Sequence, residues 1–372
     1  MMNKLDLRGK LTLVIPTRNR SAYLNRLLSF CEGSFPPISI IVADSSDSEE
    51  SRINLTRCSQ VSMHRLRRLG YASEVPVLAK MIDAVRNVET PFMALCADDD
   101  FLLPGCLPEA VHILDSDPST SCVQGLEVFF RSGASIGKPD RLLLDLHAGG
   151  SVLDETPAAR MVRALSNYRA SFYAIRRTQE FLEDSMKLNP LKDQYMLLEL
   201  ASASLDAIRG KIKRLPQVMS FRESHPQVAY RTHSEVTYWE KVIFSPAFSE
   251  VLQAYISIVG GSLESFQKDG GGDASGKVRE SLVAFTIWHF RRMASGSQTC
   301  EQKLPKKVRE FVFEIPIVGG GARWMWLKLA KAYDRAKLSS KFGLALRQPD
   351  FLKLIECLEA EFGFRRGCAV IR

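Results

Sequence analysis

The chain has 372 residues, of which 45% are hydrophobic and 25% charged, a composition typical of a globular protein with an ample core. No apolar run is long enough for a signal peptide, and none approaches the roughly 18 to 20 apolar residues that a membrane span requires. The 8 cysteines form no CxxC pair and have no regular spacing, so we expect buried free thiols in a cytoplasmic protein rather than a zinc site.

The net charge of +8 is concentrated in the last quarter of the chain. Between Lys277 and Arg372 there are 19 Lys and Arg residues against 9 Asp and Glu residues. This surplus indicates a polyanionic partner, which is a membrane surface, a nucleic acid or a phosphate-bearing substrate. A solvated basic face that aids solubility explains the same charge equally well.

Strand-like and helix-like segments alternate through the first half of the chain. Apolar runs predict strands over 11–17, 38–44, 61–66, 91–97 and 121–130. Apolar residues at helical spacing predict helices that include 24–31, 74–88 and 107–114. Residues 131–156 read as a loop or an inserted hairpin, and the pattern returns to the sheet over 168–177 and 210–225, around a helix near 191–204. The alternation predicts an α/β domain with a sheet that is parallel at least in part.

Beyond about residue 235 the pattern becomes mainly helical. Helices are expected over 236–258, 277–296, 303–313, 322–340 and 349–362, with a flexible connection over 260–277. We therefore divide the chain into an α/β domain over 1–234 and a basic helical domain over 235–372. Within the latter, residues 319–341 interleave aromatic and cationic side chains, which fits either an interfacial helix on an anionic bilayer or a packed bundle helix.

Polar side chains follow three of the predicted strands at the point where each strand ends. Thr17, Arg18 and Asn19 follow the first strand, Asp44 follows the second, and the triplet Asp98-Asp99-Asp100 follows the fourth. In open α/β sheets, ligands bind outside the carboxyl ends of the strands. A nucleotide-type ligand at this edge is therefore expected.

Three adjacent carboxylates repel one another, so a neutralising cation is expected beside them. Mg²⁺ and Mn²⁺ prefer oxygen ligands and bind through one or two carboxylates together with substrate phosphates. The alternative is that Asp99 or Asp100 caps the following turn while the other carboxylates are merely exposed. The neighbouring polar segments favour the metal.

The stretch from "LTLVIPTRNR" through "ISIIVADSSD" to "ALCADDDFLLPGCL" resembles the nucleotide-binding half of family 2 glycosyltransferases. That resemblance implies the GT-A fold, a Rossmann-like nucleotide-binding mixed sheet flanked by helices, here followed by a mainly α-helical C-terminal region. It covers 9–130 well and 165–230 more loosely. Relative to the family's Asp-x-Asp-Asp motif, counted back from Pro104, Ala97 replaces the first carboxylate and Asp98 occupies the spacer.

Carried over position by position, the resemblance implies a set of residues around the nucleotide-sugar donor. The pocket would be lined by Pro16, Thr17, Arg18 and Asn19. Asp44 would contact the nucleoside, and Lys80 and Arg222 would meet the diphosphate. The divalent cation, Mn²⁺ or Mg²⁺, would be held by Asp99 and Asp100, with His225 as a further ligand or phosphate contact, while Asp98 faces the sugar or partly replaces Ala97.

Inverting transfer also requires a general base that takes the proton from the acceptor hydroxyl. Asp193 matches the aspartate of the family's Glu-Asp motif, although Lys192 replaces the glutamate. We expect Asp193 in the first turn of a helix, with Glu199 as the fallback. A first-turn charge without a catalytic role is the alternative interpretation.

The resemblance implies an enzyme of polysaccharide or glycoconjugate biosynthesis. Its donor would be a nucleotide-sugar, with UDP favoured, and its acceptor a glycan or lipid-linked glycan. The basic C-terminal region could contact a membrane peripherally and its helices could pair subunits into a homo-oligomer, both of which stay open, whereas a nucleic acid partner is not expected. Two alternatives stay open: a sugar-1-phosphate nucleotidyltransferase, disfavoured because "VIPTRNRSAYL" has no glycine, and a catalytically inactive nucleotide-sugar or glycan-binding module.

Overall fold

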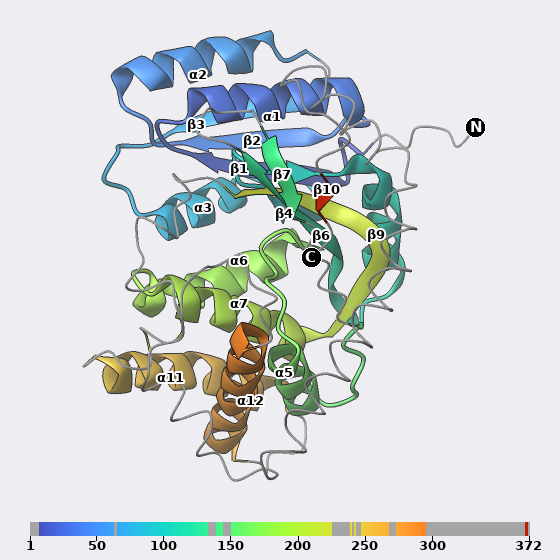
Figure 1. The fold of residues 1–372 in the computed structure, drawn as a ribbon, viewed down its shortest axis with the longest axis vertical. Coiled ribbons are helices and arrows are strands. Elements are labelled where there is room, and N and C mark those ends of the chain that lie inside the picture. The colour runs from blue at the N-terminus through green and yellow to red at the C-terminus, as the bar shows by residue number, and fades with distance from the viewer. Residues whose placement is uncertain are drawn as a thin grey trace.

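The computed structural model describes residues 7–62, 65–132, 139–143, 150–224, 239, 242, 247–267, 273–294 and 369–370. Its described strands join one mixed sheet in the order β10-β7-β6-β8-β4-β1-β2-β3, and β9 joins this sheet through β6. Figure 1 shows the sheet between two layers of helices.

The N-terminal half of the sheet is parallel. It consists of β1 (Leu11–Thr17), β2 (Ser39–Asp44), β3 (Arg65–Gly70) and β4 (Phe92–Leu95), with β1 between β2 and β4. The strands β1, β2 and β4 are buried almost throughout, as expected for continuous apolar runs covered on both faces. β3 forms the edge, contains three arginines and two leucines, and is only half-buried.

The second half of the sheet is mixed. β8 (Ile175–Arg177) runs antiparallel to both β4 and β6 (Thr120–Ser132), and β6 pairs in parallel with the long β9 (Lys211–Ser224). The short β5 (Phe101–Leu102) pairs with β9, directly after the acidic triplet. At the outer edge, β7 (Pro139–Leu143) pairs with β6, and β10 (Ala369–Val370) pairs with β7.

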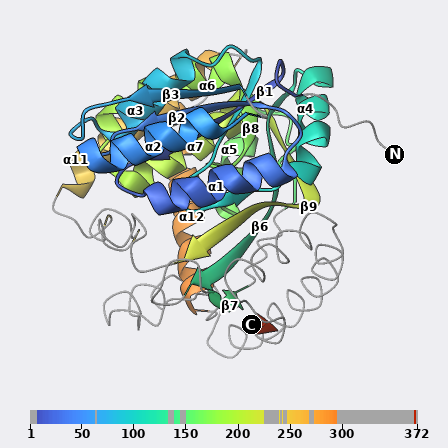
Figure 2. The ribbon, with the colours of Figure 1, turned by 90° about the horizontal axis from the view of Figure 1, so that it is seen from above.

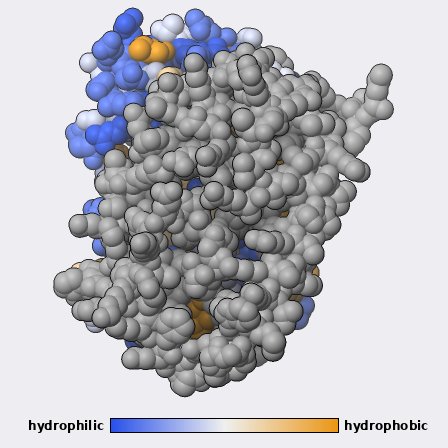
Figure 3. All heavy atoms as spheres, viewed as in Figure 1, coloured by the Kyte–Doolittle hydropathy of each residue, from blue (hydrophilic) through white to orange (hydrophobic). Residues whose placement is uncertain are grey.

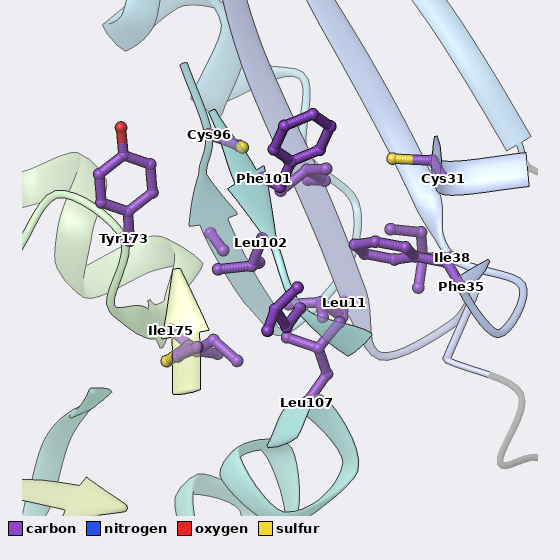
Figure 4. Close-up of a cluster of buried hydrophobic side chains, with 14 of the residues drawn as sticks. Leu11, Cys31, Phe35, Ile38, Cys96, Phe101, Leu102, Leu107, Tyr173 and Ile175 are labelled. Carbon is purple, nitrogen blue, oxygen red and sulfur yellow. The ribbon is translucent and has the colours of Figure 1, made fainter. Parts of the chain in front are cut away.

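One layer of helices contains α1 (Ser21–Ser34), α2 (Ser48–Gln60) and α4 (Leu107–Ser116). Figure 2 shows α1 and α2 together on this side of the sheet. Leu24, Leu27 and Leu28 of α1 pack on the apolar side chains of β1, β2 and β4, and part of this core is drawn in Figure 4. α2 buries only Asn54 and Cys58, and hydrophilic side chains gather at its end of the molecule in Figure 3.

The opposite layer begins with α3 (Val77–Arg86), α5 (Pro157–Ser166), α6 (Thr178–Lys187) and α7 (Tyr195–Arg209). The helices α11 (Phe248–Phe266) and α12 (Ala274–Ala294) pack onto α7 and α5 and share one apolar core with them. Within the described residues, no helix has the length and apolar character needed to cross a membrane.

Several expected elements differ from the observed ones. The third strand lies at Arg65–Gly70 rather than 61–66, because three arginines interrupt the apolar pattern of this edge strand. The predicted connection over 260–277 is largely helical, since α11 continues to Phe266 and α12 begins at Ala274. The helices α2, α5 and α6 were not expected. The helices expected over 303–313, 322–340 and 349–362, and the interleaved segment 319–341, lie outside the described residues.

Candidate active site

The carboxyl ends of the parallel strands lie level at one edge of the sheet. Thr17 at the end of β1 is in register with Asp44 at the end of β2, which is in register with Gly70 at the end of β3. On the other side of β1, the Cys96 amide donates to the Val14 carbonyl at 3.0 Å. The three polar segments singled out in the sequence are therefore neighbours in space.

Asn19 connects the first of these segments to the second. Its φ of 53° lies in the left-handed region, which asparagine adopts more readily than most residues. The Asn19 amide donates to Ser46 Oγ at 2.8 Å, and Asn19 Oδ1 accepts from the Asp47 amide at 2.9 Å. The turn ends β1 abruptly, and α1 begins two residues later, after Arg20.

Asp98 and Asp99 share one arginine. Arg20 donates through one guanidinium nitrogen to Asp98 Oδ1 at 2.9 Å and through the other to Asp99 Oδ2 at 2.6 Å. Thr17 Oγ1 donates to the second Asp98 oxygen at 2.7 Å. Burial, together with the charge of Asp99, raises the pKa of Asp98 to about 7. Arg20 thus bridges two buried carboxylates, and the charge of Lys80 also favours the ionised form of Asp98.

Asp100 is directed to a different part of the molecule. Its Oδ1 accepts from the Glu223 amide at 2.6 Å, and its Oδ2 accepts a hydrogen bond from the Tyr173 hydroxyl. Figure 4 shows that hydroxyl pointing away from the labelled apolar side chains. Burial and the neighbouring Asp99 charge raise the pKa of Asp100 to about 8. These contacts tie the acidic loop to β9.

Arg222 lies beside Asp100 on β9. Its Nε is 3.7 Å from Asp100 Oδ2, its Nη1 is 3.6 Å from Glu127 Oε2, and the guanidinium lies over the Tyr173 ring at 5.0 Å. Although burial opposes the charged form, Tyr173, Glu127 and Asp100 raise the pKa of Arg222. A permanent positive charge, that of Arg222, thus lies beside Asp100, the residue that follows the Asp98–Asp99 pair.

Asp44 is held by polar groups from three elements. The Ser46 amide donates to Oδ1 at 2.8 Å, while Asn54 and Arg68 donate to Oδ2 at 3.0 and 2.9 Å. Although burial opposes ionisation, these hydrogen bonds lower the pKa of Asp44. The carboxylate is therefore fixed in its ionised form at the end of β2.

Lys80 of α3 is buried directly beneath the same edge. Its Nζ donates to the Thr17 carbonyl and to Ser45 Oγ, both at 2.8 Å. The ammonium thus joins the end of β1 to the end of β2. Burial lowers the pKa of Lys80 to about 8.

This shift predicts a pH-dependent difference between the wild-type protein and Lys80→Met. Between about pH 8 and 10.5 the unfolded lysine keeps a proton that the native one has lost, so native stability rises with pH in that window. The free energy of unfolding of the wild type should therefore rise, relative to Lys80→Met, by on the order of 2 kcal/mol. Urea denaturation of both proteins across this range measures the difference. A difference that stays flat with pH would contradict the prediction.

The candidate bases lie on and beside α7. Asp193 is exposed and precedes the helix, which begins at Tyr195 rather than near 191. Glu199 lies inside the helix, where its Oε1 accepts from the Tyr168 hydroxyl at 2.8 Å. Burial raises the pKa of Glu199, an effect that Tyr168 and Arg222 partly oppose. The positive charge of Arg222 thus acts on the Glu199 carboxyl.

The remaining predicted residues are placed as follows. Pro16 lies within β1, one residue before Thr17, and Arg18 is exposed in the loop after it. The structure brings together Thr17, Arg18, Asn19, Asp44, Lys80, Asp98 and Asp99. Asp100 and Arg222 lie beside this group, and His225 lies outside the described residues.

The chemistry of the donor set fits a hard divalent cation. Among the described residues, no group of three or more His, Cys, Asp and Glu side chains is arranged to hold a metal ion. Asp98 and Asp99 nevertheless supply two adjacent carboxylates, both of which Arg20 contacts. Mg²⁺ commonly binds through one or two protein carboxylates plus substrate phosphates, which is the number available here.

Four residues of this region were not predicted from the sequence. Arg20 contacts both carboxylates of the acidic pair, Tyr173 binds Asp100, and a buried ion pair joins Arg26 to Glu223. Arg20 follows Asn19 directly, so its place in the "TRNR" segment was an available signal. The other three lie far from their partners along the chain and had none.

The family model "Glycosyl transferase family 2" matches residues 12–178, which contain β1 to β4 and all of the polar segments at their ends. No curated protein sequence matches the chain. Among solved structures, that of S. aureus TarS is 14% identical with a TM-score of 0.49, covering 82% of this chain, which in turn spans 50% of that one.

Two further structures are similar. TarS 1–349 in complex with UDP is 15% identical with a TM-score of 0.41, covering 80% of this chain and 94% of that one. TarS 1–349 in complex with UDP-GlcNAc is 14% identical with a TM-score of 0.40, covering 78% of this chain and 93% of that one.

Proposed function

Residues 12–178 belong to glycosyl transferase family 2, and from this premise we propose a metal-dependent, inverting glycosyltransferase. The sugar would move from a nucleoside diphosphate donor, with UDP favoured, to a hydroxyl of a glycan or lipid-linked glycan in polysaccharide or glycoconjugate biosynthesis. The observation that carries the proposal is the convergence of Thr17, Asp44 and the Asp98–Asp99 pair at one sheet edge.

In this proposal the nucleoside lies beside the ends of β1 and β2. Asp44, fixed as a carboxylate, accepts from the nucleoside, and the pocket is lined by Pro16, Thr17, Arg18 and Asn19. Lys80 and Arg222 contribute positive charge toward the diphosphate, and Asp98 faces the sugar. Arginine suits this role because its planar fork matches phosphate oxygens.

A Mn²⁺ or Mg²⁺ ion would be held by Asp99 with help from Asp98. Asp100 and His225 complete the predicted ligand set, although the Asp100 carboxylate is engaged by Tyr173 and the Glu223 amide in the present structure. When bound, such a cation stabilises the negative charge that develops on the departing nucleoside diphosphate.

The general base is proposed to be Asp193, with Glu199 as the second candidate. Asp193 is solvent-exposed and accessible to an acceptor hydroxyl. Glu199 is less exposed, but its raised pKa makes it a better proton acceptor than an ordinary glutamate. Single-turnover rates of Asp193→Asn and Glu199→Gln decide between them: loss of transfer with donor affinity retained identifies the base.

The function itself is tested with a panel of nucleotide-sugars. UDP-, GDP-, dTDP- and CMP-linked sugars are added with and without Mn²⁺ or Mg²⁺, and thermal shift and nucleotide release are recorded. We expect one donor class to stabilise the chain and to release its nucleotide only when a divalent cation is present.

The alternative functions are distinguished by the same panel and by one further assay with a nucleoside triphosphate and a sugar-1-phosphate. Pyrophosphate release from a nucleoside triphosphate and a sugar-1-phosphate would identify a nucleotidyltransferase. Donor binding without metal dependence or turnover, for every acceptor tried, would identify a binding module.

The C-terminal region, 235–372, is proposed to serve the acceptor side of the reaction. Its basic residues would hold a cytoplasmic enzyme at the inner face of the membrane, where lipid-linked acceptors lie, and its helices would provide a surface for pairing subunits. Sedimentation with vesicles that contain anionic lipid tests the first role, and light scattering tests the second.

A further inference from the structure

Arg20 separates the acidic pair from solvent. The Asp98 and Asp99 side chains are 3% and 8% exposed, whereas the Arg20 side chain that binds both is 23% exposed. The two guanidinium nitrogens contact one oxygen of each carboxylate, at 2.9 and 2.6 Å. A ligand that approaches these oxygens from the solvent side therefore meets the Arg20 guanidinium first.

The position of Arg20 is defined by its surroundings. It follows Asn19, whose left-handed backbone turns the chain back toward the end of β4, and it immediately precedes α1. Its guanidinium also lies over the Tyr23 ring at 4.8 Å. A divalent cation on the same carboxylate oxygens would face this guanidinium as a like charge, so the two cations exclude one another.

We propose that Arg20 is a positioning residue. Its guanidinium holds Asp98 and Asp99 until the metal binds them, and it then binds the donor diphosphate instead. The inference rests on the proposed function for the metal and the donor. The displaced guanidinium remains next to the two carboxylates, where the phosphates of the donor also bind, and its planar fork suits a phosphate group.

This exchange of partners by the Arg20 guanidinium makes metal binding and diphosphate binding depend on each other. Without diphosphate, the cation has to break two charge-assisted hydrogen bonds of Arg20 to reach the pair. With diphosphate present, those bonds are replaced by bonds to phosphate. By linkage, UDP should tighten Mn²⁺ binding and Mn²⁺ should tighten UDP binding by the same factor.

The test is calorimetric titration of the full chain with Mn²⁺ alone, UDP alone, and each in the presence of the other. In the wild type, UDP should tighten Mn²⁺ binding by at least about fivefold, the lower end of ordinary couplings. In Arg20→Gln, Mn²⁺ alone should bind at least about fivefold tighter than in the wild type, and the coupling should largely disappear.

Arg20→Lys keeps the positive charge but cannot contact both carboxylates at once as the guanidinium does. We therefore expect its Mn²⁺ affinity and its coupling to UDP to lie between those of the wild type and Arg20→Gln. Circular dichroism shows whether Arg20→Gln is folded. If it is not, the titrations compare Arg20→Lys with the wild type instead. Arg65→Gln is the matched control, because it removes the same charge from a side chain that is 68% exposed at the edge of the sheet. It should bind Mn²⁺ as the wild type does.

Equal or weaker Mn²⁺ binding by both Arg20 variants would overturn the inference. Titration of Asp99→Asn then separates the two proposals. If that variant loses Mn²⁺ binding while the Arg20 variants match the wild type, the metal site stands and only the role of Arg20 is wrong. If Asp99→Asn binds Mn²⁺ as the wild type does, the metal site was misplaced and both proposals fail.

Discussion

Replacing Asp99 with asparagine is expected to reduce sugar transfer by about a hundred- to a thousandfold, the usual cost of losing one preorganised electrostatic contact. Asp99 belongs to the pair that shares Arg20 and is the predicted metal ligand. Asparagine keeps the size of the side chain and its carbonyl oxygen, so the loop should keep its shape. The loss should come from removal of the negative charge, not from unfolding.

The measurement is the rate of nucleotide release at saturating donor, with Mn²⁺ present. Asp115→Asn is the matched control, since Asp115 is 53% exposed in a surface ion pair with Lys10 and should retain wild-type activity. A folded Asp99→Asn variant that turns over at the wild-type rate would remove this residue from the site.

Replacing Glu223 with methionine is expected to destabilise the fold by about 3 to 5 kcal/mol, the usual cost of leaving one partner of a buried ion pair alone. The Glu223 and Arg26 side chains are 0% and 5% exposed, and Arg26 Nη2 lies 2.5 Å from Glu223 Oε2. Arg26 also donates to the Asp99 carbonyl at 2.7 Å. The variant leaves the Arg26 charge buried beside the acidic loop.

The double variant Arg26→Met/Glu223→Met should recover part of that loss, because no buried charge is then left without its partner. Urea denaturation of the wild type, Glu223→Met, Arg26→Met and the double variant gives the four free energies of unfolding that the comparison needs. For comparison, Glu89→Met breaks the exposed pair with Arg65, where both side chains are at least 65% exposed, and should cost less than about 1 kcal/mol. A double variant that loses the sum of the two single losses would show that the buried pair is not coupled.

The parts of the site that could be predicted from sequence depend on short-range signals. Continuous apolar runs identified β1, β2 and β4, and parallel strands place their carboxyl ends at one edge, so the convergence of Thr17, Asp44 and the acidic triplet could be predicted. The acidic triplet divides differently from what its spacing to Pro104 suggested. The spacing grouped Asp99 with Asp100 and set Asp98 apart, whereas in the structure Asp98 and Asp99 share Arg20 and Asp100 binds β9.

The unpredicted parts depend on contacts between distant segments or on weak patterns. The apolar face of α2 is too small for a helical signal, because only Asn54 and Cys58 are buried. β3 was shifted by several residues, since an edge strand that contains three arginines lacks an apolar run. Nothing in the local sequence links Tyr173 or Glu223 to the acidic loop, because those contacts exist only once β8 lies beside β4 and β9 lies beside β5.

Hydrogen–deuterium exchange with UDP and Mn²⁺ tests the central claim most directly, because it locates the donor without requiring the acceptor. At about 1 mM UDP, near the upper end of usual substrate affinities, we predict slower exchange in peptides covering 15–20, 44–47 and 96–100. The helix α11 (Phe248–Phe266), on the far side of α7, should be unchanged. Unchanged exchange in all three loops, or protection confined to another part of the chain, would contradict the account.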